Sequence, residues 1–512
     1  MPRNLLRCLT QPIDRGKLKM PSLVKRQKVQ SLGKLTGYRL FFATLTLIIG
    51  VIFSLVINYP DFYSGMLFIF CLVLLFDIAF YAIFSRENSL FLLIFAFYHI
   101  FLFIIPGMIH ISVNRFPFYG LSYSIDETRT VAVLLTLFSG FFYLGVMFFA
   151  ARVADRRRRV NAPQRAYNLK LLLFSALGLL LLTMLLAQMF GLEFFLSRRA
   201  GEGASLVDKT TATNQILINI IRFGSFVAAM TVWLVFRQHK SWILLMLAIT
   251  ISGVALIFNW PIAIPRFYLF GYLLAILYVF FDFKSSFRKC ILFVTMSASL
   301  LLLFPLASIL SRGDISQIDR FDPVRYYTEN GDFDGMQSTH NVVRYVNRHG
   351  PAMGNQLLGS LLTFVPRSAW SEKPVSTGGL VAANAGYRFL NISSPLAAEL
   401  YIDFWYLGVV PLSFLLGMLA SWIDRKAAWL GSRTDIVLPL ILGLAIGFET
   451  IVLRGSLMAA VAPVALVFLF AFLMRAFSSR SIRRSGYYAR PHLPTSRHSA
   501  NIHFGNLPRE QS

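Results

Sequence analysis

The chain has 512 residues, of which 56% are hydrophobic and only 14% are charged, and its mean hydropathy is +0.62. So few charged side chains cannot cover the surface of a water-soluble protein of this size. The apolar residues fall in runs of about 20, the length of helix that crosses a hydrocarbon core of about 30 Å. The sequence therefore predicts an all-α, polytopic integral membrane protein.

The net charge of +25 does not indicate a nucleic-acid-binding protein. Much of the positive charge lies in the two tails and in short loops beside apolar runs, as on the cytoplasmic side of membrane proteins. The cysteines are Cys8, Cys71 and Cys290, and they form no CxxC or Cys/His cluster. Neither a disulfide framework nor a zinc site is predicted.

The chain begins with a basic tail, residues 1–37, which we expect to be cytoplasmic. Residues 38–310 contain about nine predicted spans, at 38–59, 62–84, 90–113, 130–153, 169–190, 216–236, 243–259, 267–283 and 291–310. Residues 396–477 contain about three more, at 396–423, 436–452 and 456–477. A second basic tail, 478–512, ends the chain. The sequence predicts about 12 transmembrane helices with both termini in the cytoplasm.

Residues 311–395 form one large hydrophilic loop, which this orientation places on the outer, periplasmic face. The run Arg156–Arg159 marks the inner face as a stop-transfer anchor, with lipid or phosphate binding as the alternative interpretation. Within the loop, Met353–Val365 is amphipathic and too short to span. We expect it to lie as a short helix in the outer interface.

Basic side chains recur on the predicted outer side at membrane level. Arg266 and Arg454 lie in very short outer turns, Arg222 lies about two turns inside its span, and Arg367 and Lys373 follow the amphipathic piece. An arginine at this depth is costly and needs a partner, a polar cavity or a ligand. Because the guanidinium fork suits phosphate oxygens, the set predicts a site for an anionic lipid headgroup such as a pyrophosphate. Salt bridges are the alternative for any one of them.

Three residues are candidate general bases: Asp334, His340 and Glu399. Glu399 opens the tenth predicted span four residues before Asp403, so the two share a helix face. His340 can titrate near neutral pH, although a loop histidine can also be an ordinary surface residue. Asp332 and Asp334 form a DxD sequence, which chelates a metal in nucleotide-sugar transferases. No further cluster of oxygen ligands accompanies it, and neither a metal nor another cofactor is predicted.

Several segments together resemble the signature of Wzy-type oligosaccharide repeat-unit polymerases. These segments are Asn259-Trp260-Pro261, Pro265-Arg266, Gly331–Asp334, Val365–Pro374, Asn391–Pro395, Glu399–Phe404 with Gly408, and Leu453-Arg454-Gly455. The layout is similar too, because that family has ten to fourteen spans and one large periplasmic loop late in the chain. In one departure, Trp405-Tyr406 interrupts what is commonly an F-G step after the acidic helix start.

The resemblance implies polymerisation of undecaprenyl-pyrophosphate-linked repeat units of O-antigen, capsule or exopolysaccharide at the periplasmic face of the bacterial inner membrane, without a metal. A hydroxyl of the incoming unit attacks the anomeric carbon of the donor glycan. The residues expected to bind the pyrophosphate are Arg222, Arg266, Arg367, Lys373 and Arg454, and the candidate bases are Asp334, His340 and Glu399. Expected partners are the lipid-linked oligosaccharide, membrane lipid, a chain-length regulator and a repeat-unit flippase.

Two alternatives remain from the sequence. An O-antigen ligase would use the same donor with lipid A-core as acceptor. A non-enzymatic flippase or transporter of lipid-linked oligosaccharide would be expected to show repeated halves and polar residues along many spans. This chain instead concentrates its polar residues outside the spans.

Overall fold

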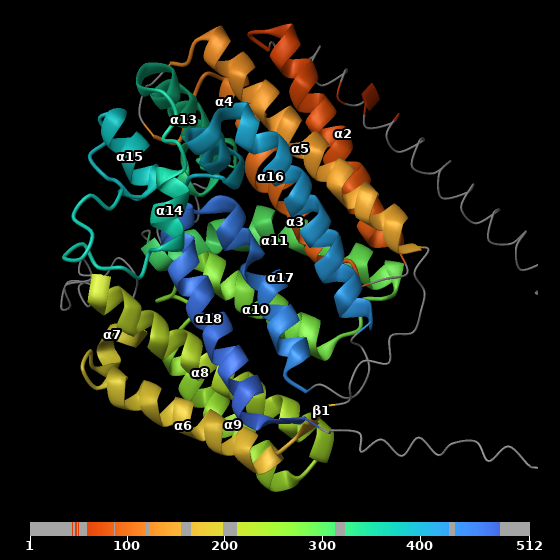
Figure 1. Ribbon diagram of the computed structural model, residues 1–512, viewed down its shortest axis with the longest axis vertical. Coiled ribbons are helices and arrows are strands. Elements are labelled where there is room, and N and C mark those ends of the chain that lie inside the picture. The colour runs from red at the N-terminus through yellow and green to blue at the C-terminus, as the bar shows by residue number, and fades with distance from the viewer. Residues whose placement is uncertain are drawn as a thin grey trace, which may run out of the picture.

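Long apolar helices form most of the protein in its computed structural model (Figure 1). The structure describes residues 59–85, 88–118, 122–154, 165–197, 212–312, 323–429 and 436–481, together with single residues at 44, 47, 48 and 50. The predictions for the 1–37 tail, for most of the first span, for Arg156–Arg159 and for most of the 478–512 tail lie outside these residues.

The long helices follow the predicted spans closely. They are α2 (Phe62–Phe84), α3 (Leu90–Phe97) continued by η1 (Tyr98–Ile104) and α4 (Ile105–Ser112), α5 (Ile125–Ala154), α6 (Leu169–Ala187), α8 (Ala212–His239), α9 (Trp242–Phe258), α10 (Arg266–Phe280), α11 (Ser286–Arg312), α16 (Leu396–Trp429), α17 (Leu438–Arg454) and α18 (Leu457–Ser478). Within the described residues, eight helical stretches are long and apolar enough to cross a membrane, and α9 and α10 are shorter apolar helices. The predicted helical class and apolar character are confirmed.

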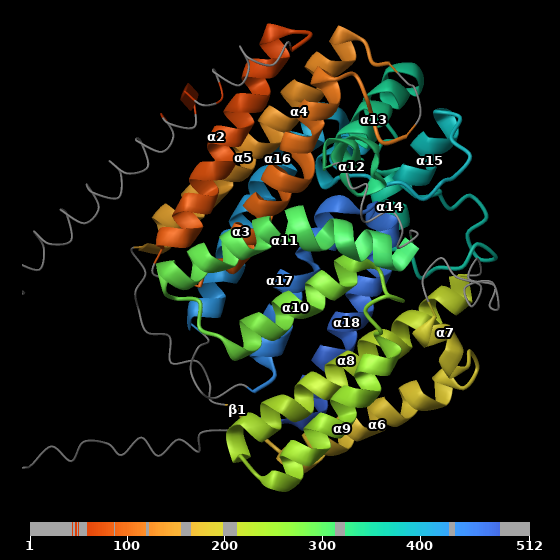
Figure 2. The same cartoon turned by 180° about the vertical axis from the view of Figure 1, so that it is seen from behind.

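Short helices fill the hydrophilic segment, as the sequence predicts. They are α12 (Pro323–Glu329), η4 (Gly331–Phe333), α13 (Gly335–His349), α14 (Asn355–Leu361) and α15 (Thr377–Asn384). A further short helix is α7 (Leu192–Leu196), and β1 (Arg165–Tyr167) pairs antiparallel with β2 (Ser479–Ser481). The α14 helix falls inside the predicted amphipathic piece. Helices α12 to α15 gather on one side of the molecule, and α7 lies apart from them beside α6 (Figures 1 and 2).

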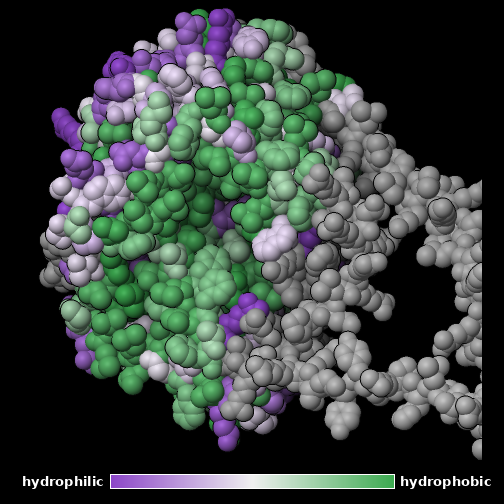
Figure 3. Space-filling model, in the orientation of Figure 1, coloured by the Kyte–Doolittle hydropathy of each residue, from purple (hydrophilic) through white to green (hydrophobic). Residues whose placement is uncertain are grey.

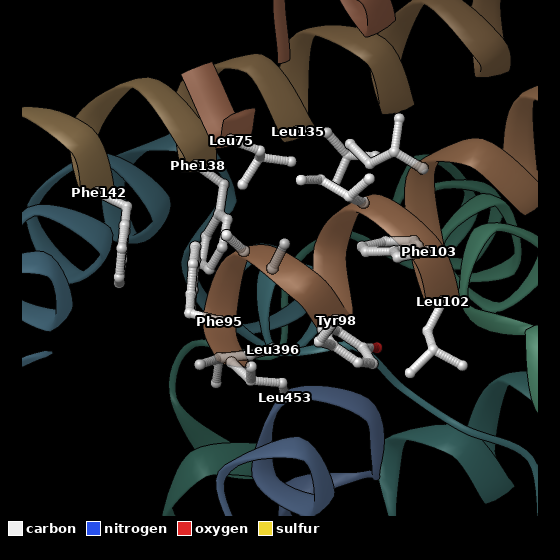
Figure 4. Close-up of a cluster of buried hydrophobic side chains, with 14 of the residues drawn as sticks. Leu75, Phe95, Tyr98, Leu102, Phe103, Leu135, Phe138, Phe142, Leu396 and Leu453 are labelled. Atoms are coloured by element: carbon white, nitrogen blue, oxygen red, sulfur yellow. The ribbon is translucent and has the colours of Figure 1, made fainter. Parts of the chain in front are cut away.

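The helices pack as two groups with α10, α11 and α17 crossing between them. Helices α2 to α5 and α16 form one group, and α6, α8 and α9 form the other (Figures 1 and 2). In the first group, the rings of Phe95 and Phe142 stack with centroids 3.6 Å apart, and Leu453 of α17 joins this core (Figure 4). Apolar side chains cover the middle of the visible face, and hydrophilic ones gather at its upper edge (Figure 3). This pattern is expected of helices whose sides face lipid.

Helices α10 and α17 lie against each other at very close range. A Cβ on Gly447 of α17 would collide with the backbone carbonyl of Gly271 in α10. Small residues allow two helix backbones to approach in this way. Gly443 likewise faces the backbone of Ala275. Contacts therefore move toward the end of α10 as they move toward the start of α17. The two helices therefore run antiparallel, and the first residue of α10 lies beside the last turn of α17.

Candidate functional site

A cavity of about 500 Å³ lies where the start of α10 meets the turn between α17 and α18. The Gly331–Asp334 turn, residues 391–393 and the rings of Phe118 and Phe389 complete its lining. The antiparallel contact of α10 and α17 explains why Arg266, at the start of one helix, and Arg454, at the end of the other, both reach it. Three of the eight predicted site residues, Arg266, Asp334 and Arg454, line this cavity.

Arg266 forms a buried ion pair with the first aspartate of the DxD sequence. Its Nη2 lies 2.5 Å from Oδ2 of Asp332, and the two side chains are only 6% and 9% exposed. Its guanidinium also lies over the ring of Phe304, 5.0 Å from the centroid. The pair neutralises two charges that would be expensive to bury separately.

Arg454 binds the second aspartate and the turn that carries it. Its Nη2 donates to the Gly331 carbonyl at 2.8 Å and to Oδ1 of Asp334 at 3.2 Å, and its Nε donates to the Asp332 carbonyl at 3.3 Å. The guanidinium lies 4.7 Å from the centroid of the Phe267 ring. Among the described residues, no acceptor engages Nη1. Because arginine has five N–H donors, this amino group is left for another acceptor at the cavity.

Asp334 is the buried carboxylate of the cavity. It is 1% exposed, its Oδ1 accepts from Arg454, and its Oδ2 accepts from the backbone N–H of Ser393 at 2.9 Å. Burial raises the pKa of the Asp334 carboxyl, while Arg454 and Ser393 act in the opposite direction. A carboxylate with a raised pKa is a stronger proton acceptor than a solvated one.

The structure places His340 outside this cavity. The ring is fully buried, its Nδ1 lies 2.9 Å from the Met336 carbonyl, and its Nε2 lies 3.3 Å from the Thr128 hydroxyl. Burial lowers the pKa of His340 to about 4. The imidazole is therefore neutral near pH 7. Its Nδ1 binds a carbonyl of its own helix, and only its Nε2 joins α13 to α5.

Glu399 lies behind the cavity wall and joins three helices. Its Oε2 accepts from the Thr377 hydroxyl of α15 at 2.7 Å, and its Oε1 accepts from the backbone N–H of Leu457, the first residue of α18, at 3.2 Å. A carboxylate at a helix start satisfies a free N–H and interacts well with the helix dipole. Asp403, one turn later, binds the backbone N–H groups of Gln356 and Leu357 at the start of α14 in the same way.

Arg367 and Lys373 hold their own loop together instead of lining the cavity. The Lys373 ammonium donates to the carbonyls of Thr363 and Val365 at 2.7 and 2.9 Å. Arg367 donates to the carbonyls of Lys373 and Pro374 at 2.5 and 3.0 Å. Burial lowers the pKa of Lys373, and the neighbouring Arg367 adds to the effect.

Arg222 is buried in α8, away from the lining. Its Nη2 reaches the Ala263 carbonyl at 3.4 Å, in the turn before α10, and its Nε has no hydrogen-bond partner among the described residues. The backbone carbonyl of Arg222 accepts from Asn259 at 3.1 Å. Arg222 thus supports the turn that delivers Arg266 to the cavity.

Sequence reasoning missed several lining residues. Asp332 drew attention only as half of a DxD motif, whereas it is the partner of Arg266. Phe118 and Phe389 carried no signal, because an isolated phenylalanine is usually a core residue. Ser393 belongs to the Asn391–Pro395 segment already noted for its family resemblance, and that segment could have pointed to it.

The described residues contain no group of three or more His, Cys, Asp or Glu side chains that could hold a metal ion. Comparison with known proteins found no matching family model, no matching curated protein and no matching solved structure.

Proposed function

We propose that the chain is a glycosyltransferase that polymerises undecaprenyl-pyrophosphate-linked oligosaccharide repeat units at this cavity, a Wzy-type reaction. The observation that carries the proposal is that Arg266 and Arg454, from two helix ends far apart in sequence, meet the carboxylates of Asp332 and Asp334 in one cavity. Glycosyl transfer from a pyrophosphate donor requires cationic groups for the leaving group and a base for the attacking hydroxyl.

In this proposal the chain has about 12 transmembrane helices, both termini are cytoplasmic, and residues 311–395 face the periplasm of a bacterial inner membrane. The cavity then opens at the level where a lipid-linked donor presents its pyrophosphate. The hydrophilic edge of the surface in Figure 3 supports an aqueous environment at one end of the helices. A chain-length regulator and a repeat-unit flippase are the proposed protein partners.

The Asp334–Arg454 pair suggests how the base and the cationic group act together. Asp334 takes the proton of the acceptor hydroxyl while the hydroxyl oxygen bonds to the anomeric carbon of the donor. The bond from that carbon to the pyrophosphate breaks, and the electron pair leaves with the pyrophosphate. Because protonated Asp334 attracts Arg454 less strongly, the guanidinium becomes available to the charge growing on the leaving group.

The remaining predicted cations take supporting roles in the proposal. Arg367 and Lys373 fix the loop of residues 363–374 through its own carbonyls. Arg222 contacts the turn before α10. A change at any of these positions would act on the pyrophosphate site only indirectly, through the backbone that the side chain holds.

The test uses purified protein and the lipid-linked repeat unit extracted from cells that lack the protein. We expect wild type to produce a ladder of lengthened glycans. Arg454→Ala and Arg266→Ala should lower the initial rate about 100-fold or more, as when one fixed donor to a developing anion is removed. Arg348→Ala, an exposed arginine on α13 outside the cavity, is the matched control and should retain the wild-type rate.

Two outcomes would contradict the proposal. One is a ladder of normal length and yield from both cavity variants, with their amounts of folded protein matched to wild type. The other is transfer to lipid A-core without any ladder, which would assign the chain to the ligase reaction.

A further inference from the structure

Three aromatic side chains form one wall of the cavity region. The Phe118 and Phe389 rings both line the cavity, with centroids 4.8 Å apart and planes at 67°. The Tyr387 ring lies 5.8 Å from each of them, nearly parallel to Phe389 and at 62° to Phe118. We call Phe118, Tyr387 and Phe389 the aromatic wall. The wall joins two segments more than two hundred residues apart in sequence.

Gln337 of α13 fixes Phe118 through the backbone. The Phe118 N–H donates to Oε1 of Gln337 at 2.9 Å, and Nε2 of Gln337 donates back to the Phe118 carbonyl at 2.5 Å. Phe118 lies outside any helix or strand, so this reciprocal pair substitutes for the backbone pairing that would otherwise hold it. Gln337 is fully buried.

The same side chain also reaches the other half of the wall. Gln337 Nε2 donates to the Tyr387 hydroxyl at 3.0 Å, and Asn341, one turn later on α13, donates to that hydroxyl at 3.1 Å. Tyr123 in turn donates to Oδ1 of Asn341 at 2.8 Å. A buried network in which each member is satisfied holds its parts in one arrangement.

The wall lies directly beside the carboxylates. A Cβ on Gly331 would meet the Phe118 ring at 2.9 Å, so the ring packs onto the turn that carries Asp332 and Asp334. The cavity lining is divided between flat apolar rings and the ionised groups beside them. A ligand with one apolar face and a rim of hydrogen-bonding groups matches this division.

We propose that the aromatic wall is the sugar-binding surface of the cavity and that Gln337 is its positioning residue. The C–H face of a pyranose ring packs on Phe118 and Phe389, and its hydroxyl rim faces Asp332 and Asp334. The inference rests on the proposed function and names the part of the cavity that receives the glycan, as distinct from the arginines that receive the pyrophosphate.

The first test separates sugar binding from chemistry. Phe118→Leu keeps apolar bulk but removes the flat ring. We expect it to raise KM for the extracted lipid-linked repeat unit about five- to tenfold, in line with the value of an aromatic contact, while kcat stays within about twofold. Phe118→Tyr should restore KM. Phe116→Leu is the matched control, because Phe116 lies on the same segment, is partly buried and does not line the cavity.

The second test addresses Gln337. Gln337→Glu retains an acceptor for the Phe118 N–H but loses the donor to the Phe118 carbonyl and to Tyr387. We expect the same rise in KM, and the double variant with Phe118→Leu should be no worse than the more affected single variant, because both act through one ring. A purely structural role would instead lower stability without moving KM.

A binding measurement keeps this inference distinct from the proposed function. The probe is the free oligosaccharide released from its lipid by mild acid, observed by saturation-transfer difference NMR. We expect its ring C–H protons to receive saturation from wild type and Phe116→Leu, and to lose it in Phe118→Leu. If the glycan binds in this way but no ladder forms, sugar binding at the aromatic wall is supported and the polymerase proposal is contradicted. If Phe118→Leu changes neither KM nor the NMR signal, or Phe116→Leu changes them equally, the wall is ordinary packing.

Discussion

Asp334 and Glu399 are both candidate bases by sequence, and a matched pair of amide substitutions separates them. Asp334 lines the cavity, whereas Glu399 binds Thr377 and Leu457 behind its wall. We therefore expect Asp334→Asn to remove most of the activity and Glu399→Gln to leave it nearly intact. The reason is geometric, since a general base must reach the proton it removes.

The structure sets the magnitude for each change. In Glu399→Gln, the amide oxygen can accept from the Leu457 N–H while the amide NH₂ donates to the Thr377 oxygen, so both contacts survive. We expect a loss of about 1 kcal/mol or less in the free energy of unfolding. Glu399→Ala removes both acceptors and should cost about 2–5 kcal/mol, as the sum of a lost helix-start partner and a lost hydrogen bond from the Thr377 hydroxyl to a carboxylate.

Asp334→Asn cannot satisfy both of its neighbours. Arg454 and the Ser393 N–H are both donors, and the amide offers only one acceptor oxygen to them. A stability loss of about 1–3 kcal/mol is expected. The catalytic loss should be larger, about 100- to 10,000-fold in rate, which is the usual contribution of a positioned base.

The assay measures the first lengthening step with purified protein and extracted lipid-linked repeat unit. Thermal unfolding of each variant supplies the folded fraction, and rates are compared per folded molecule. A folded Glu399→Gln protein that is 100-fold slower than wild type would refute the argument and make Glu399 the base. An Asp334→Asn protein with the wild-type rate would refute it equally.

Two further predictions concern stability. Trp405 breaks the helical path of α16 with φ +51° and ψ −147°, a strained conformation that costs about 1–3 kcal/mol for a residue with a Cβ. The Trp405→Gly protein should therefore unfold at a higher temperature than the Trp405→Ala protein. The opposite order of unfolding temperatures, which is normal inside a helix, would contradict the strain. His340 has a folded pKa of about 4 against an ordinary 6.5, so the unfolded chain binds the extra proton first as the pH falls, and stability is lost between about pH 6.5 and 4. From pH 7 to 5, His340 should lower the free energy of unfolding by about 2 kcal/mol. This loss is measured as the difference in the pH dependence of unfolding between wild type and His340→Gln, with His349→Gln, at an exposed position, as control. An equal pH dependence in all three proteins would contradict the prediction.

The helical class could be predicted because it depends on local sequence. Runs of apolar residues of membrane-spanning length give helices whatever their neighbours are, and α10 and α17 begin or end within a few residues of the predicted limits. Their close antiparallel contact could not be predicted. It depends on Gly271 and Gly447 facing each other across two helices, and a single sequence contains no pairing information of that kind.

The candidate site was predictable only where a residue is unusual for its position. Arg266 and Arg454 stood out because charge in very short turns at the bilayer is costly, and the structure brings both to one cavity. Arg367 and Lys373 stood out for the same reason, yet their donors bind carbonyls of their own loop. The sequence indicates that a cation needs partners, but the fold decides whether those partners are ligand or backbone.

The fold changes the roles that the sequence suggests for Arg454 and Asp334 but not their place in the site. Considered one residue at a time, Arg454 belongs to a cationic clamp and Asp334 to acid–base chemistry. In the fold they are partners, with Arg454 donating to Asp334 and to the turn on which Asp334 sits. Removing either leaves the other as an uncompensated charge in a buried place. Their contributions to rate and stability therefore cannot be additive, and a loss of activity on changing one of them measures the pair.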